Sequence, residues 1–170
     1  ALLVIFLYIF VRFADWQYGL GGVIALAHDS IITLGMFSLF WGILPFSLEI
    51  DQAFIAAILT IIGFSINDTV IIFDRIREYL HLYPKRDEAE IMDNAMNSTL
   101  RRTFSTSLTV LVVLVAIFIF GGASIRGFTF ALLIGIFVGT YSSVFVATPI
   151  VYDTKMRLGK KLRAAAPATK

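Results

Sequence analysis

Five apolar stretches follow one another along the chain, and polar segments separate them. Each of the last four approaches the roughly 20 residues that an α-helix needs to cross the hydrocarbon core of a bilayer, whereas the first is shorter. The pattern therefore predicts an all-α fold, a polytopic transmembrane helical bundle of about five spans. The stretches are residues 1–11, 20–44, 53–73, 103–120 and 128–152.

The longest polar segment, residues 74–102, is predicted to contain structure of its own. The helix of the third stretch is expected to continue past the membrane surface until Pro84 breaks it. Asp87 followed by Glu90 resembles a capping box that opens a new helix. Apolar side chains then recur on one face, which predicts an interfacial amphipathic helix on the inner leaflet that leads into the fourth span. This stripe consists of Ile91, Met92, Ala95, Met96, Thr99 and Leu100.

The composition agrees with a membrane protein and excludes several kinds of site. Of the 170 residues, 58% are hydrophobic and only 15% are charged, which is too apolar for a soluble domain. The chain has no cysteine, so disulfides, thiolate metal sites and thiol catalysis are excluded. We find no phosphate-binding loop, metal-ligand cluster or nucleophile triad, and we expect neither a bound metal, nor a cofactor, nor covalent catalysis.

Lys and Arg are unevenly divided between the links, which predicts an orientation. The segment after the third stretch and the C-terminal end are rich in both, whereas segments 45–52 and 121–127 contain only Arg126. The positive-inside rule therefore places the long central link and the C-terminus in the cytoplasm. The net charge of +2 is explained by these cytoplasmic links and does not call for a nucleic-acid partner.

The sequence begins in an apolar stretch and ends in a basic segment. Residue 1 is Ala and lies inside an apolar stretch, without the charged segment or the cleavage site of a signal peptide. We interpret the sequence as part of a longer chain. Within it we expect a transmembrane domain over residues 1–153 and a basic cytoplasmic tail over residues 154–170, disordered at its end.

Asp68, next to Asn67, lies deep inside the third apolar stretch. It is five residues from Phe73, which places it about 8 Å from the inner end of the span. A carboxylate at that depth is costly against lipid, so it is expected to face the protein interior or a wet cavity. Such residues commonly mark proton or ion pathways, and a buried structural hydrogen bond to a neighbouring helix is the alternative.

Arg102 offers a partner for this carboxylate, because it lies near the inner end of the fourth span at a comparable depth. Ser105, Thr106 and Thr109 follow at spacings of three, four and seven residues, which predicts a polar face on that helix. An Asp68–Arg102 pair would satisfy two charges that neither helix could bury alone. The alternative is that the arginine extends to lipid headgroups.

Two further features concern the second and fifth spans. His28 and Asp29 form a candidate proton relay, because His titrates near neutral pH; polar packing between helices is the alternative. Small residues recur every fourth position along the fifth span, which predicts close helix packing at Gly135 and Gly139.

Several segments together resemble the SecF and SecDF family, and the resemblance covers nearly the whole chain. The segment that carries most of it, GFSINDTVIIFDRIRE, joins the Asn-Asp-Thr motif to a charged helix end. The matching segments are residues 63–78, Ala25-Leu26-Ala27-His28-Asp29, Arg102-Thr103 with Thr106-Ser107, Phe120-Gly121-Gly122 and Ala147-Thr148-Pro149.

The resemblance implies an accessory membrane subunit of the bacterial Sec translocon, built on one half of the resistance-nodulation-division (RND) transporter fold. It implies a multi-pass location in the inner membrane and coupling of protons, or of sodium ions, to export. It also implies roles in proton conduction for Asp68 and Arg102, and we expect Asn67 and Thr106 to belong to the same pathway. The implied partners are a SecD half or subunit, the SecYEG translocon, membrane lipid, and unfolded preprotein through a periplasmic domain outside this sequence.

Two other functions are consistent with the same residues. An RND-type proton-coupled exporter of small molecules would share the fold and the intramembrane carboxylate. A structural scaffold that holds translocon components together would need no titrating group.

Overall fold

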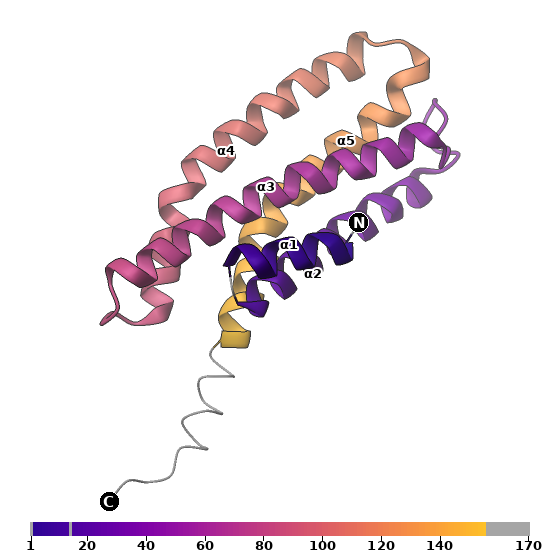
Figure 1. Ribbon diagram of the computed structural model, residues 1–170. Helices are drawn as coiled ribbons and strands as arrows, with labels where there is room; N and C mark the ends of the chain where they lie inside the picture. The colour runs from indigo at the N-terminus through magenta and orange to yellow at the C-terminus, as the bar shows by residue number, and fades with distance from the viewer. Residues whose placement is uncertain (1, 14, 156–170) are drawn as a thin grey trace, which may run out of the picture.

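The computed structural model describes residues 2–13 and 15–155, which form helices joined by short links (Figure 1). The helices are α1 (Leu2–Phe13), α2 (Trp16–Phe40), α3 (Gln52–Leu82), α4 (Glu88–Phe120) and α5 (Ala123–Ser142). α5 passes into a π-helical turn, η1 (Ser143–Ala147), and the helix then continues to Lys155. The described part of the predicted tail, residues 154 and 155, is helical, and the rest of the tail lies outside the described residues.

Four of the described helical segments are long and apolar enough to cross a membrane. They are α2, α3, α4 and the segment that runs from α5 through η1 to Lys155. α1, with 12 residues, is shorter than a span. The fold is therefore the predicted all-α membrane bundle, with the first apolar stretch forming a short helix beside α2.

Local sequence signals explain where the helices begin and end. Asp51 is the N-cap of α3, and its carboxylate accepts a hydrogen bond from the Phe54 amide at 2.8 Å. Asp87 caps α4 in the same way through the amide of Ala89 at 3.2 Å. α3 continues well past Phe73, as expected, and ends at Leu82, two residues before Pro84.

The predicted amphipathic helix is present, but it forms the first turns of α4 and is not a separate surface helix. α4 runs without interruption from Glu88 to Phe120. Met92 and Ala95 are buried in one apolar cluster with Phe73 and Ile76 of α3. The stripe therefore packs, through Met92 and Ala95, against the C-terminal half of α3.

The buried apolar residues form two clusters, one toward each end of the bundle. The cluster toward the α3–α4 turn includes Tyr18, Phe73, Ile76 and Val151, and the cluster toward the α2–α3 link is built around residues such as Phe37, Phe54, Ile61 and Ile136. Along α2, α3, α4 and α5, the buried residues between the two clusters are mainly small or polar. The core is thus divided by a layer of polar side chains.

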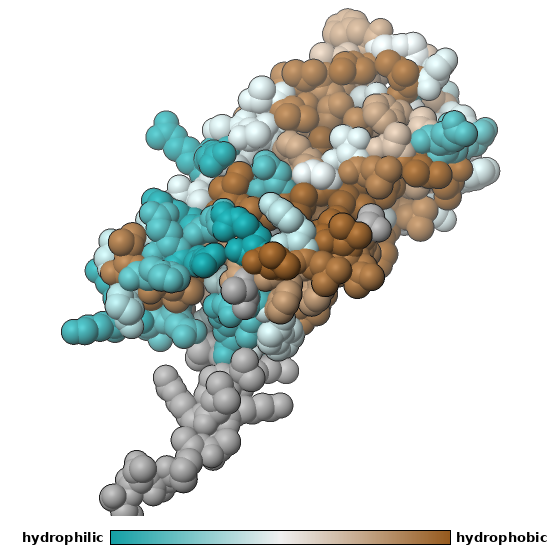
Figure 2. Space-filling model, viewed as in Figure 1, coloured by the Kyte–Doolittle hydropathy of each residue, from teal (hydrophilic) through white to brown (hydrophobic). Residues whose placement is uncertain are grey.

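The two ends of the bundle carry different links (Figure 1). The α2–α3 link and the α4–α5 turn lie at one end, and the α1–α2 and α3–α4 turns lie at the other with the end of the helix that follows η1. On the face shown in Figure 2, hydrophilic residues gather where α3 passes into α4, and a broad apolar surface covers most of the remaining length. This arrangement fits a bundle whose long axis crosses a membrane.

Candidate functional site

Five polar residues on four helices meet between the two apolar clusters, and we call them the polar layer. Hydrogen bonds link these residues across the helices, and two of them are neighbours on α3. All but Thr140 are at most 2% exposed. The polar layer consists of Asp29 on α2, Ser65 and Asp68 on α3, Ser107 on α4 and Thr140 on α5.

Asp68 is the predicted intramembrane carboxylate, and the structure places it inside the bundle. Asp68 is 2% exposed, and its Oδ2 accepts a hydrogen bond from the Ser107 hydroxyl at 3.5 Å. That distance is longer than the roughly 2.7–2.8 Å of a typical O–H···O hydrogen bond. The charged form of this carboxylate is therefore only weakly stabilised by hydrogen bonding.

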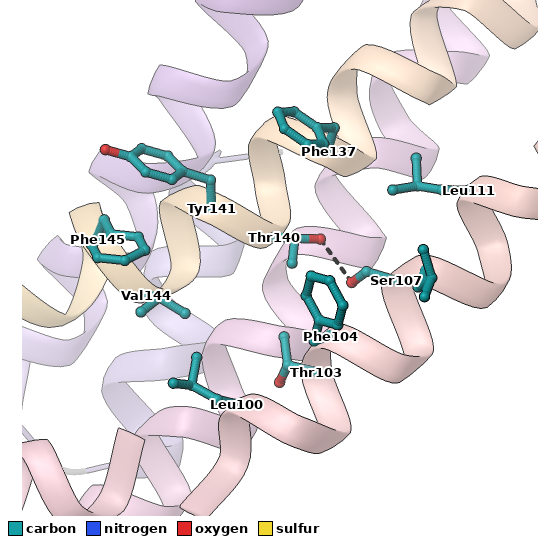
Figure 3. A pocket seen from close by; sticks show the side chains of 11 residues that line it. Leu100, Thr103, Phe104, Ser107, Leu111, Phe137, Thr140, Tyr141, Val144 and Phe145 are labelled. Carbon is teal, nitrogen blue, oxygen red and sulfur yellow. Dashed lines mark hydrogen bonds between the residues drawn. The ribbon is translucent and has the colours of Figure 1, made fainter. Parts of the chain in front are cut away.

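A chain of hydroxyl groups continues from Asp68 toward a groove between α4 and α5. The hydroxyls of Ser107 and Thr140 are 2.7 Å apart, and that of Thr140 also lies 2.8 Å from the Ile136 carbonyl (Figure 3). Each hydroxyl has one proton to donate, so the direction of these bonds can reverse. When Asp68 is ionised Ser107 donates to it, and when Asp68 is protonated Ser107 is free to donate to Thr140.

The groove beside this chain is largely apolar and has a volume of about 340 Å³. Phe104 and Leu111 line it from α4, and Phe137 and Phe145 line it from the opposite helix (Figure 3). Thr103, 3% exposed, also lines it, and its hydroxyl has no hydrogen-bond partner among the described residues. The hydroxyl chain therefore ends at the base of an apolar groove.

The structure does not form the expected ion pair between Asp68 and Arg102. Arg102 is exposed and lines a different hollow, of about 350 Å³, between α3 and α4 on the side of the α3–α4 turn. Ile71, one turn after Asp68 on α3, lines the same hollow. The reason is helical phase, because α4 turns Thr103 and Ser107 inward and places Arg102 at the exposed edge of the α3–α4 contact.

The other two residues expected in the pathway are also on the outer surface of this chain. Asn67 is exposed, and so is Thr106, whose hydroxyl donates to the Arg102 carbonyl at 2.9 Å. The hydroxyls that face the bundle are those of Thr103 and Ser107, which sequence reasoning missed. The apolar stripe at the start of α4 could have identified them, because Met92, Ala95, Thr99, Thr103 and Ser107 continue one helical face.

His28 and Asp29 lie at the other side of the polar layer. Asp29 is fully buried, and its Oδ2 accepts a hydrogen bond from the Ser65 hydroxyl at 2.7 Å. The His28 Nδ1 lies 3.1 Å from the other carboxylate oxygen, Oδ1. The pair is therefore anchored to α3, and the polar layer contains a second carboxylate besides Asp68.

Gly135 and Gly139 lie where α5 packs closely against α3. A Cβ atom on Gly135 would overlap the side chain of Ile61. A Cβ on Gly139 would lie 3.1 Å from the Ser65 Cβ and 3.5 Å from the Asp29 Oδ2. The absence of a side chain at Gly139 is thus part of what lets Asp29 and Ser65 meet.

Within the described residues there is no group of three or more His, Asp or Glu side chains that could hold a metal ion.

The family described as "Protein export membrane protein SecD/SecF, C-terminal" matches residues 1–157 of this chain. The chain belongs to the SecD/SecF family. The matched range includes every residue of the polar layer, together with Arg102, and the match confirms the resemblance seen in the sequence.

Individual relatives agree with this assignment. The chain is 56% identical to a protein translocase subunit SecF of Rhodothermus marinus, over 97% of this chain and 53% of that protein. It is 47% identical to SecF of Haemophilus influenzae, over 92% of this chain and 46% of that protein. The chain therefore spans about half the length of the SecF relatives that it matches.

Solved structures of the SecD/SecF family share the fold. A crystal structure of SecDF in a super-membrane-facing form matches with a TM-score of 0.88 and 42% identity, over 97% of this chain and 22% of that one. A second, of the translocon-associated membrane protein SecDF from Thermus thermophilus, matches with a TM-score of 0.80 and 43% identity, over 88% of this chain and 20% of that one. The chain is accordingly a multi-pass membrane protein of this family.

Proposed function

We propose that this chain is the membrane part of a SecF-type subunit that couples an ion gradient to protein export through the Sec translocon. The proposed location is the bacterial inner membrane, with the C-terminus in the cytoplasm. The similarity to SecF subunits supports the role in export, and the Lys and Arg distribution supports the orientation. The proposed coupling ion is the proton, with sodium as the alternative.

The observation that carries this proposal is the state of Asp68. The carboxylate is buried inside an apolar bundle and has one long hydrogen bond, to Ser107. Within residues 2–13 and 15–155, no Lys, Arg or His nitrogen lies within ion-pairing distance of it. A carboxylate so weakly stabilised can take up and release a proton, and the protein around it can respond to the change.

The hydroxyl chain supplies the structural response. Protonation of Asp68 removes the need for a donated hydrogen bond from Ser107, which can then donate to Thr140 on α5. Proton uptake at α3 thereby alters the bond between α4 and α5. A shift of these helices would reach the outer end of the bundle, where a periplasmic domain of a longer chain could act on preprotein.

The outward-facing polar residues support a proposal about partners. Asn67 on α3 and both Arg102 and Thr106 on α4 are exposed at membrane depth, where contact with lipid is unfavourable. We assign this surface to contact with a SecD half or subunit. SecYEG and unfolded preprotein are the further proposed partners, through parts of the protein outside this sequence.

The experiment uses inverted membrane vesicles that contain the full-length protein with its SecD partner. Asp68→Asn should abolish the stimulation of preprotein translocation by a proton gradient while the complex still assembles, because Asn keeps the shape and removes the titration. Asp93→Asn, an exposed Asp to Asn change on α4, is the matched control and should behave as wild type. Replacing the proton gradient by a sodium gradient distinguishes the two ions. Normal stimulation with Asp68→Asn would favour the structural scaffold.

A further inference from the structure

The polar layer contains a carboxylate that is better buried and better bonded than Asp68. Asp29 is 0% exposed and sits where α2, α3 and α5 meet. Its two oxygens have different partners, the Ser65 hydroxyl at 2.7 Å and the His28 ring at 3.1 Å. A buried carboxylate that contacts an imidazole is a proton donor–acceptor pair, because either group can hold the proton that they share.

His28 connects this buried carboxylate to the outside of the chain. Its side chain is 31% exposed, whereas that of Asp29 is fully buried. With a proton on Nδ1 the ring donates to the Asp29 Oδ1. The second ring nitrogen, Nε2, remains available to exchange a proton with whatever lies beside α2. The pair thus spans from a part-exposed position to the centre of the bundle.

Ser65 connects Asp29 to Asp68. Ser65 and Asp68 are three residues apart on α3, so their Cβ atoms are neighbours at about 5–6 Å on the helix surface. One water molecule can bridge a gap of that size between two polar side chains. Thr69, one turn after Ser65 and 1% exposed, has a hydroxyl without a hydrogen-bond partner among the described residues, so this turn of α3 can accommodate a further hydrogen bond.

We propose that His28, Asp29 and Ser65 form a second proton-binding site that exchanges protons with Asp68. This inference rests on the proposed role of Asp68. In the first step an imidazolium at His28 gives its Nδ1 proton to the Asp29 carboxylate, which leaves a neutral ring and a carboxylic acid. In the second, the carboxylic acid rotates about its Cβ–Cγ bond so that its O–H faces Ser65. It then gives that proton to the Ser65 oxygen, the Ser65 hydroxyl proton passes to the bridging water, and the water gives one of its protons to the Asp68 carboxylate.

The surroundings leave Asp68 as the titratable neighbour of this site. Among the described residues, Asp29 and Asp68 are the two titratable side chains of the polar layer. Tyr141 lines the groove on the far side of α5, Arg126 lies near its outer end, and the α1 cation Arg12 is bound to Asp74 at 3.1 Å. The other titratable residues of the packed helices lie elsewhere. On α3 they follow Phe73 and are Arg75, Arg77, Glu78, Tyr79 and His81. On the helix after η1 they are Tyr152, Asp153 and Lys155, and on α1 the residue is Tyr8.

The test measures proton flux into liposomes that contain the full-length protein with its SecD partner, from about pH 5.5 to 8. His28→Gln retains a hydrogen-bond donor for Asp29 and removes the titration. We expect wild-type flux to show an inflection within this pH range, and His28→Gln to lose that inflection with a roughly tenfold lower flux. His81→Gln, at the exposed end of α3, is the matched control and should keep the wild-type profile.

Asp29→Asn should lower the flux by a similar factor. If that variant fails to assemble because its site is fully buried, the part-exposed His28 still decides the question. A His28→Gln profile that coincides with wild type, or one that is uniformly lower with its inflection intact, would overturn the second site. Flux that persists in Asp68→Asn would instead overturn the proposed function, so the two failures are distinguishable.

Discussion

At the scale of residues, the two buried carboxylates differ in how their charge is stabilised. Burying an ionised carboxylate is costly unless hydrogen bonds or a cation compensate. Asp29 has two short contacts, to Ser65 and His28, whereas Asp68 has a single 3.5 Å bond to Ser107. Asp68 therefore has fewer hydrogen bonds to stabilise its charge, and Ser107 is the residue that donates the one it has.

Ser107→Ala tests this control. The change removes the hydrogen-bond donor from the Asp68 carboxylate, and a hydrogen bond to a charged group contributes about 1.5–3 kcal/mol. We expect translocation driven by a proton gradient to fall by roughly tenfold or more in the full-length protein. Thr109→Ala, on the exposed side of the same helix, is the control and should have little effect. Equal activity of the two variants would argue against the hydroxyl chain.

The sequence reveals Asp68 but not its partner, for a physical reason. A carboxylate inside an apolar stretch is conspicuous, whereas one serine among many hydroxyl residues is not. The expected polar face, Ser105, Thr106 and Thr109, follows from the spacing after Arg102 and is exposed in the structure. The inward face is set by packing against α3 and α5, which depends on tertiary contacts and not on the polarity of α4 alone.

At the scale of elements, α5 owes its central position to small residues. It packs against α2, α3 and α4, and Gly135 and Gly139 allow α3 to approach closely. The four-residue spacing of small side chains is visible in the sequence, so this contact face could be predicted. The π-helical turn η1 could not, although Pro149 follows it and lacks the amide hydrogen that a regular helix needs there.

Gly135→Ala tests the close approach. The new methyl group would overlap Ile61, which is 1% exposed, and overpacking of a core costs about 1–3 kcal/mol. We expect a lower melting temperature for the detergent-solubilised full-length protein. Gly35→Ala is the matched control, because a Cβ there meets nothing within 4 Å and alanine favours the helix by about 0.5–1 kcal/mol. A Gly135→Ala protein as stable as the control would contradict the α3–α5 packing.

At the scale of the whole molecule, links with different charge lie at opposite ends of the bundle. The turn between α3 and α4 contains Lys85 and Arg86, whereas the α2–α3 link contains Glu49 and Asp51. The arrangement in Figure 1 places these links at opposite ends. The sequence alone predicted this division, because the positive-inside rule depends on the links and not on how the helices pack.

Cysteine labelling tests the orientation. Single cysteines at Arg86, Glu49 and Ser124 in a cysteine-free full-length protein can be exposed to an impermeant thiol reagent in cells with a permeabilised outer membrane. We expect reagent outside the inner membrane to label the positions of Glu49 and Ser124 and to spare Arg86 until the inner membrane is opened. The reverse pattern would invert the proposed topology.

The measurement that tests the account most directly is proton flux through the reconstituted full-length protein with its SecD partner, compared between wild type and Asp68→Asn. Both proteins should assemble and melt alike, because Asn fills the same space as Asp. The account predicts flux down an imposed pH gradient in wild type and none above the protein-free background in Asp68→Asn. Equal flux in the two proteins would contradict the assignment of Asp68 as the proton-carrying group.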